Sequence, residues 1–205
     1  MIDKTKAILA VGFLAALPLL ARAEVEPVPG ATQTTPTQAP STGPFDRKFE
    51  MHGITFRVAS PNSASGNRVE ITTTGLTIDN SPWAQEVDGV VTGAEVADIN
   101  ADLSPEIYVY VQGRGDEAGA ALVAYSANKK RSLSAITLPE LAAQAGATKG
   151  YCGRDEMAVV EGVIARRFPI CDDHRKPTGK WRQLQYKLVP GEAGWQLRVD
   201  RMIEF

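Results

Sequence analysis

Apolar and polar side chains alternate with a period of two along most of this sequence. Clear runs are Ile54–Val58, Leu184–Leu188 and Trp195–Val199. Because successive side chains of a β-strand point to opposite faces, this alternation predicts strands with one face in a core and the other in water. Two further runs, Ile107–Val111 and Ala120–Tyr125, are apolar at almost every position. We expect these two strands to be buried on both faces and to lie at the centre of a sheet.

Glycine and proline stand between the strand-like runs, at His52-Gly53, Gly113–Gly119 and Pro190–Gly194. These residues favour the tight turns of hairpins. The sequence therefore predicts an all-β fold, an antiparallel sandwich or barrel of about eight to ten strands.

One short helix should interrupt the strands near residues 138–146. Thr137 and Glu140 have the spacing of a capping box, and Pro139 occupies the first turn, where proline is favoured. Gly146 then ends the run of helix-forming residues. A helix of this length can act only as a lid over the strands.

Residues 1–23 have the pattern of a secretory signal peptide. Lys4 and Lys6 are followed by the apolar stretch Ala7–Leu20. Small residues then occupy the positions that a signal peptidase tests, which predicts cleavage after Ala23. A membrane anchor is the alternative, but it would need about 20 apolar residues. We therefore expect a periplasmic or secreted protein without a membrane span.

Residues 24–44 contain five prolines among threonine, glutamine, alanine and serine. Such a segment cannot bury enough apolar surface to offset its ordering entropy, so we expect a flexible leader. The remaining residues, 45–205, are enough for one core and should form a single domain.

The charge of the chain excludes nucleic acid as a main partner. All 205 residues carry 22 basic and 24 acidic side chains. Removing residues 1–23, which hold three basic side chains and one acidic side chain, leaves 19 and 23, a net charge of −4. The basic clusters Lys129–Arg131 and Arg166-Arg167 are short, and we interpret them as solvated faces.

The two cysteines, Cys152 and Cys171, are expected to form a disulfide, because an exported protein meets an oxidising compartment. A two-residue turn at Glu161-Gly162 would place them directly opposite each other in a hairpin. Closing this loop should contribute about 3 kcal/mol in the chain-entropy model. We expect a bulge near Gly153, because a regular ladder would put the pair at a site where cross-strand disulfides fit less well.

Catalytic motifs are missing from the sequence. There is no G-x-S-x-G, no H-E-x-x-H and no phosphate-binding glycine loop, and the two histidines, His52 and His174, lie in expected turns. We therefore expect a protein that is not an enzyme and holds no catalytic cofactor. An unrecognised hydrolase is the alternative, and it would depend on Asp98, Glu106 or Asp155.

One acidic segment has the spacing of a calcium-binding loop. Oxygen donors stand at positions 1, 3, 5 and 9, but the sixth position, where such loops have glycine, is Leu103. The candidate calcium ligands are Asp98, Asn100, Asp102 and Glu106. The alternative is a polar turn whose carboxylates accept hydrogen bonds from backbone N–H groups.

The glycine-rich loop between the two apolar strands should project from a rigid base. Its glycines allow the backbone to approach a partner closely. The loop is Gly113, Arg114, Gly115, Asp116, Glu117, Ala118 and Gly119. A solvated hairpin tip without a partner is the alternative.

A series of motifs follows in one order along the chain. The motifs are Asp98–Val111, Leu122–Asn128, Ser132–Leu141, Gly150-Tyr151, Asp155-Glu156, Val159–Gly162, Arg166–Ile170, Pro177–Lys180, Arg182–Leu188 and Gly194-Trp195. This series resembles the PliI family, the periplasmic inhibitors of I-type (invertebrate) lysozyme. The resemblance covers residues 86–203 densely and 45–85 loosely.

The resemblance implies a β-sandwich, exported to the periplasm, that inhibits an I-type lysozyme by inserting a loop into its cleft. In the family this loop is a Ser-Gly-rich turn that ends in Tyr-Gly. The matching place is Gly113–Gly119, with Ala118 where the family has tyrosine. The resemblance also allows a homodimer. The alternative function is a non-catalytic periplasmic binding module for calcium, an envelope glycan or a protein ligand on the same scaffold.

Overall fold

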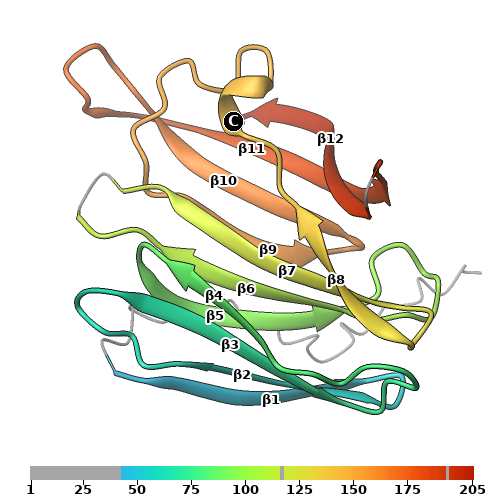
Figure 1. The fold of residues 1–205 in the computed structure, drawn as a ribbon. Helices are drawn as coiled ribbons and strands as arrows, with labels where there is room; N and C mark the ends of the chain where they lie inside the picture. Colours follow the sequence, from blue (N-terminus) through green and yellow to red (C-terminus); the bar gives the residue numbers. More distant parts are fainter. Residues whose placement is uncertain (1–42, 116–117, 193) are drawn as a thin grey trace, which may run out of the picture. The chain divides into compact units, whose positions relative to one another are not determined.

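The computed structural model describes residues 43–115, 118–192 and 194–205. The predicted signal peptide, and the predicted leader up to residue 42, lie outside the described residues. The described residues form twelve β-strands and one short 3-10 turn, and they contain no α-helix (Figure 1). In this part of the chain, no helix has both the length and the apolar composition needed to cross a membrane.

The strands form two sheets, one of four strands in the order β1-β2-β3-β4 and one of eight in the order β5-β6-β7-β8-β12-β11-β10-β9. The four-stranded sheet consists of β1 (Phe45–Met51), β2 (Ile54–Ser60), β3 (Asn67–Thr74) and β4 (Trp83–Val87). The eight-stranded sheet consists of β5 (Val90–Ala97), β6 (Glu106–Gln112), β7 (Ala120–Asn128), β8 (Ser132–Thr137), β9 (Glu156–Val160), β10 (Val163–Cys171), β11 (Pro177–Pro190) and β12 (Trp195–Glu204).

The predicted all-β sandwich is confirmed. The four-stranded sheet packs against the first four strands of the larger sheet, and a core of buried side chains such as Phe56, Ile71, Val109 and Val123 fills the space between them. In β2 every second residue is buried, as the alternation predicted. Figure 1 shows the two layers, with β1–β4 on one side of β5–β8.

A second core lies inside the curl of the eight-stranded sheet. It contains Tyr108 on β6, Phe168 on β10 and Tyr186 on β11, which are each fully buried. Strand β6 contributes to both cores, because Val109 faces the four-stranded sheet and Tyr108 faces the inside of the curl. The prediction that β6 and β7 are central is confirmed. Burial on both faces is confirmed for β6 and for residues 123–127 of β7, but it was wrong for the start of β7, where Ala121 is exposed.

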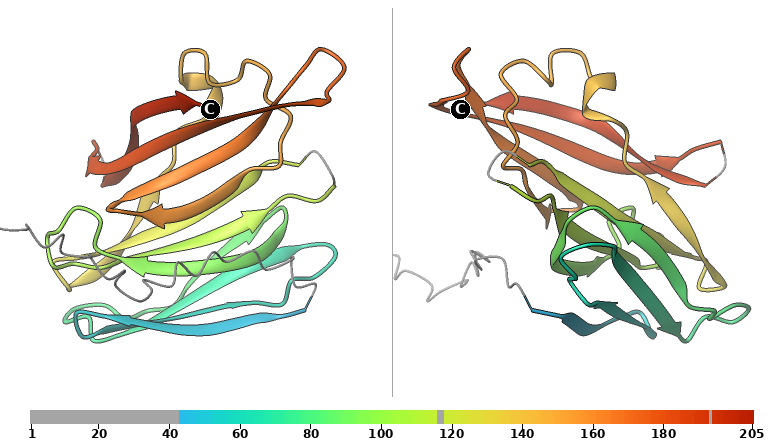
Figure 2. Two further views of the ribbon diagram at one scale, coloured as in Figure 1. Left: turned by 180° about the vertical axis from the view of Figure 1, so that it is seen from behind. Right: turned by 60° about the vertical axis from the view of Figure 1, so that its left-hand side comes forward.

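The eight-stranded sheet is nearly closed, because its two edge strands approach each other (Figure 2). Glu95 on edge strand β5 links them. Its carboxylate accepts a hydrogen bond from the backbone N–H of Val159 on edge strand β9, at 2.8 Å, and another from the hydroxyl of Tyr110. An edge closed in this way exposes fewer unpaired backbone groups to other chains.

Two details of the strand arrangement differ from the sequence-based expectation. The strands number twelve, because exposed strands such as β4 show little alternation of apolar and polar residues. One pair, β8 and β12, is parallel, joined only at Trp195 with Ile136 and at Gln196 with Thr137. All other pairs are antiparallel.

The predicted helix at 138–146 was wrong, because only a 3-10 turn forms, at Leu141–Ala143. Thr137 cannot cap a helix, since its backbone belongs to β8 and pairs with β12. Glu140 makes no side-chain cap hydrogen bond. The 3-10 turn is closed by backbone hydrogen bonds from Ala143 to Glu140 and from Gln144 to Leu141, at 3.0 and 3.1 Å, and Leu141 is buried in the second core.

The predicted hairpin with its disulfide is present. Strands β9 and β10 pair around Glu161-Gly162 in the expected register as far as Glu156 with Arg167, and Cys152 is bonded to Cys171. The ladder is then interrupted, and pairing resumes with a shift of two residues at Tyr151 with Ile170. This irregularity lies where the bulge was expected.

Candidate functional site

The Gly113–Gly119 loop connects the central strands β6 and β7. Its base is closed by a hydrogen bond from the N–H of Gly113 to the carbonyl of Gly119, at 3.0 Å. The side chain of Gln112 donates to the carbonyl of Ala118, also at 3.0 Å. Asp116 and Glu117 lie outside the described residues.

Arg114 is exposed, but its guanidinium lies across two neighbouring loops. Nη2 donates to the carbonyl of Ser63, between β2 and β3, and to that of Gly89, between β4 and β5, at 3.4 Å for the latter. The side chain is therefore held against the loops at this end of the sandwich and would have to exchange these acceptors to meet a partner.

A buried polar network supports the loop from behind. Asp155 accepts hydrogen bonds from Nε of Arg166 and from the hydroxyl of Tyr151, both at 2.6 Å, and from the N–H of Ala120 at 3.0 Å. Gly119 lies so close to the Tyr151 hydroxyl that a Cβ there would collide with it. The loop base and the network are thus fitted to each other.

The charges of this network compensate each other. Burial, together with the hydrogen bond to Asp155, raises the pKa of the Tyr151 hydroxyl to about 12. Burial alone would lower the pKa of Arg166, but the Asp155 carboxylate raises it above its ordinary value. At neutral pH Arg166 is therefore a cation and Tyr151 a neutral phenol, and both donate hydrogen bonds to Asp155.

The interpretation of Arg166-Arg167 as one solvated face was wrong for Arg166. Its side chain is buried, whereas Arg167 is exposed and pairs with Glu156 at 2.6 Å. The period of two could have revealed this difference, because Arg166 shares its face of β10 with the buried Ile164 and Phe168.

The candidate calcium ligands come together at the opposite end of β6 from the Gly113–Gly119 loop. One oxygen from each of Asp98, Asp102 and Glu106 lies within 4.8 Å of the others. Asn100 lies in the same turn, and its Oδ1 is buried and has no hydrogen-bond partner among the described residues.

The carboxylates of this turn also serve the backbone, as the alternative interpretation required. Asp98 accepts hydrogen bonds from the N–H groups of Asp102 and Leu103, at 3.0 and 2.9 Å. Asp102 accepts one from Ser104 at 2.8 Å. Leu103 has a φ of 65°, a left-handed conformation that glycine adopts freely, so the turn forms although the glycine of calcium loops is missing.

Glu106 is fully buried, and no cationic side chain of the described residues forms an ion pair with it. Its carboxylate accepts hydrogen bonds from the N–H of Ile99 at 3.1 Å and from the hydroxyl of Ser126 at 3.4 Å. Burial, with a smaller contribution from the charges of Asp98 and Asp102, raises the pKa of Glu106 to about 8. A divalent cation would remove this unfavourable concentration of negative charge. Calcium binding remains a prediction.

The sequence considerations did not connect Asn128 and Trp195. The indole N–H of Trp195 donates to Oδ1 of Asn128 at 2.7 Å, which places an aromatic ring beside the basic turn at Lys129–Arg131. No local pattern signals this contact, because the two residues are far apart in sequence.

Comparisons with known proteins give no further assignment. The chain matches no family model, and neither its sequence nor its fold has a significant match among curated proteins or solved structures.

Proposed function

We propose that this protein is an exported, non-catalytic inhibitor of a lysozyme, most closely suited to an I-type enzyme, and that its Gly113–Gly119 loop enters the cleft of the enzyme. The observation that carries the proposal is the support of this loop. It joins β6, which is buried on both faces, to the start of β7, and the Asp155 network is packed behind its base. A loop held in this way loses little conformational entropy on binding. The order of motifs shared with the PliI family supports the same function.

The chemistry of the loop fits a cleft that holds carboxylates. A lysozyme uses two carboxyl groups for catalysis. Arg114 would exchange its two carbonyl acceptors for these carboxylates, and hydrogen bonds between charged groups are the stronger kind. The net charge of −4 on residues 24–205 would speed the encounter with a cationic enzyme.

The test is a lytic assay of the purified chain, residues 24–205, against one lysozyme of each of the invertebrate, chicken and goose types. We expect inhibition of one type, and Arg114→Glu should abolish it by placing a carboxylate among the carboxylates of the enzyme. Arg198→Glu, which changes the same charge on the exposed face of β12, is the matched control. Thermal unfolding of both variants shows whether they remain folded.

Two outcomes would contradict the proposal. Inhibition of none of the three lysozymes would remove the function. If Arg114→Glu is folded and has the same inhibition constant as the wild type, Arg114 does not contact the enzyme. The rest of the loop would then make the contact.

The second candidate function is a periplasmic binding module. The convergence of Asp98, Asp102 and Glu106 within 4.8 Å favours it, because three carboxylates in one turn suit a calcium ion. Stabilisation of the chain by calcium on heating would support this function.

A further inference from the structure

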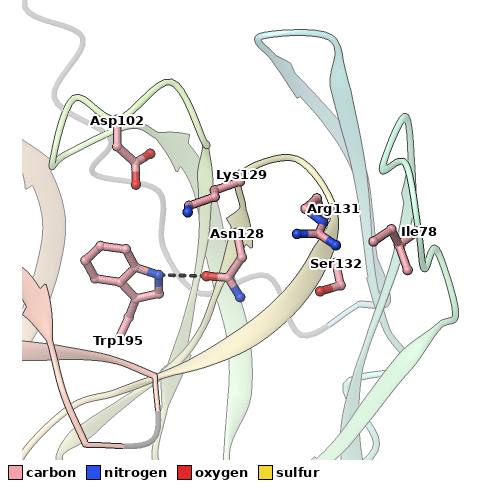
Figure 3. A pocket seen from close by; sticks show the side chains of 7 residues that line it. All are labelled: Ile78, Asp102, Asn128, Lys129, Arg131, Ser132 and Trp195. Carbon is pink, nitrogen blue, oxygen red and sulfur yellow. Dashed lines mark hydrogen bonds between the residues drawn. The ribbon is translucent and has the colours of Figure 1, made fainter.

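A hollow of about 290 Å³ opens at the end of the sandwich opposite the Gly113–Gly119 loop (Figure 3). Three turns and the start of β12 form its wall. Its volume lies at the small end of the range for ligand pockets, which is about 300 to 1,000 Å³, so it suits a ligand of the size of one sugar ring. The lining residues are Ile78, Asp102, Asn128, Lys129, Arg131, Ser132 and Trp195.

The aromatic side of the hollow is fixed in place. Trp195 is half-buried, and its indole N–H donates to Oδ1 of Asn128 at 2.7 Å. Nδ2 of Asn128 in turn donates to the hydroxyl of Ser134 at 2.6 Å. The indole therefore presents a pre-oriented apolar surface beside polar groups, an arrangement that suits the C–H face of a pyranose ring.

The cationic side of the hollow is equally constrained. Lys129 and Lys130 have φ values of 47° and 55°, a left-handed conformation that non-glycine residues adopt only where the surroundings enforce it. They lie at the tight turn between β7 and β8, where the N–H of Arg131 donates to the carbonyl of Asn128 at 2.9 Å. The segment between β3 and β4 also bonds to this turn. Backbone N–H groups of Thr77 and Ile78 donate to the carbonyls of Lys130 and Arg131, at 2.9 and 3.0 Å.

Two cations of the turn, Lys129 and Arg131, line the hollow. Neither Lys129 nor Arg131 forms an ion pair with a carboxylate of the described residues. In Figure 3 the amino group of Lys129 lies on the side of Asp102 and Trp195, and the guanidinium of Arg131 lies beside Ser132, with Asn128 between them. Asp102 on the opposite wall supplies an acceptor for hydroxyl groups.

We infer that this hollow binds a carboxylated saccharide. The sugar ring packs on Trp195, its hydroxyl groups bond to Asp102 and Ser132, and its carboxylate lies between Lys129 and Arg131. Two charge-assisted contacts make the carboxylate the main determinant of affinity. This inference is independent of the proposed inhibition, because the hollow and the Gly113–Gly119 loop lie at opposite ends of β7.

The test follows the indole N–H resonance of Trp195 in a proton–nitrogen correlation spectrum of the protein, assigned with the variant Trp195→Phe. Methyl β-glucuronide and methyl β-glucoside form the matched pair of probes, because they differ only in a carboxylate that replaces a primary alcohol. The glucuronide should shift this resonance saturably, with a Kd at least about ten-fold lower than that of the glucoside. N-acetylmuramic acid, compared with N-acetylglucosamine, shows whether a carboxylate on an ether side chain is preferred to one on the ring.

The double variant Lys129→Gln/Arg131→Gln should raise the Kd of the glucuronide to that of the glucoside and leave the glucoside unaffected. Lys48→Gln/Lys176→Gln removes the same charge far from the hollow and should change neither value. The inference is overturned if neither acidic sugar shifts the Trp195 resonance saturably, or if each acidic sugar and its neutral counterpart bind with equal Kd.

Discussion

Two carboxylates are fully removed from water at opposite ends of the eight-stranded sheet, and their surroundings differ in one respect. Asp155 faces the guanidinium of Arg166 at 2.6 Å, whereas Glu106 faces Asp98 and Asp102 and forms no ion pair within the part of the chain that the structure describes. Both accept hydrogen bonds from backbone N–H groups. The difference therefore lies in charge compensation and not in hydrogen bonding.

This difference assigns different roles to the two ends of the sheet. A buried charge with a built-in partner stabilises one geometry, which is what the base of a binding loop requires. A buried carboxyl group without a partner is costly when ionised, so it either keeps its proton or acquires a cation from solution.

The largest effect is expected at Asp155, the buried carboxylate whose charge Arg166 compensates. Asp155→Asn preserves the shape of the side chain but leaves Arg166 as an unpaired buried cation, so it should lower the free energy of unfolding by about 3 to 5 kcal/mol. Urea denaturation at neutral pH measures this value. Glu156→Gln removes an exposed ion pair on the adjacent residue and should change stability by at most about 1 kcal/mol. Similar effects of the two variants would contradict the assigned role of the Asp155 network.

The next effect is the pH dependence of the free energy of unfolding that Glu106 causes. In the unfolded chain Glu106 loses its proton near its ordinary pKa of 4.5, whereas in the folded protein it keeps the proton up to a pKa of about 8. Between these values the folded state binds more protons than the unfolded state. The free energy of unfolding therefore falls as the pH rises through this interval, by as much as about 5 kcal/mol from this group alone.

The variant Glu106→Gln has no proton to lose and should escape this decrease. In urea denaturation with a chelator present, the wild type should lose stability relative to the variant between pH 4.5 and pH 8. The same comparison with Glu156→Gln should show little change. A constant difference between wild type and Glu106→Gln at both pH values would mean that burial does not raise the pKa of this carboxyl group.

Local patterns in the sequence predicted the strands and the disulfide hairpin well. The alternation in β2, the apolar run of β6 and the turn at Glu161-Gly162 depend on neighbouring residues, and the structure follows them. The acidic turn belongs to the same class, because Asp98 and Asp102 lie within one loop.

Contacts between distant segments were not predicted. Arg166 is buried because Asp155, on the irregular segment before β9, reaches back to it. Trp195 lines a hollow because β12 returns beside β8 in a parallel pair. The capping box at Thr137 failed for the same reason, since pairing with β12 competes with helix formation. Sequence periodicity records which face of a strand is buried, but not which strand will lie beside it.

The smallest effect is the stabilisation of the folded protein by calcium at Glu106. If a calcium ion supplies the cation that Glu106 lacks, calcium at ten to a hundred times its Kd should add about 1.4 to 2.7 kcal/mol to the free energy of unfolding at pH 8. It should also reduce the pH dependence, because the ion favours the deprotonated carboxylate. Thermal unfolding with calcium, with magnesium and with a chelator measures the effect.

Asp102→Asn should remove the stabilisation by calcium, since it takes one charge from the turn while an oxygen remains to accept the hydrogen bond from Ser104. Asp79→Asn is the matched control, because Asp79 accepts the same kind of hydrogen bond from Ser81, at 2.8 Å, outside the acidic turn. If calcium stabilises both variants equally, or does not stabilise the wild type, Glu106 is a buried carboxyl group kept neutral by its proton. A response that only Asp102→Asn abolishes would mean that both buried carboxylates are compensated, Asp155 by a residue of the chain and Glu106 by an ion taken from solution.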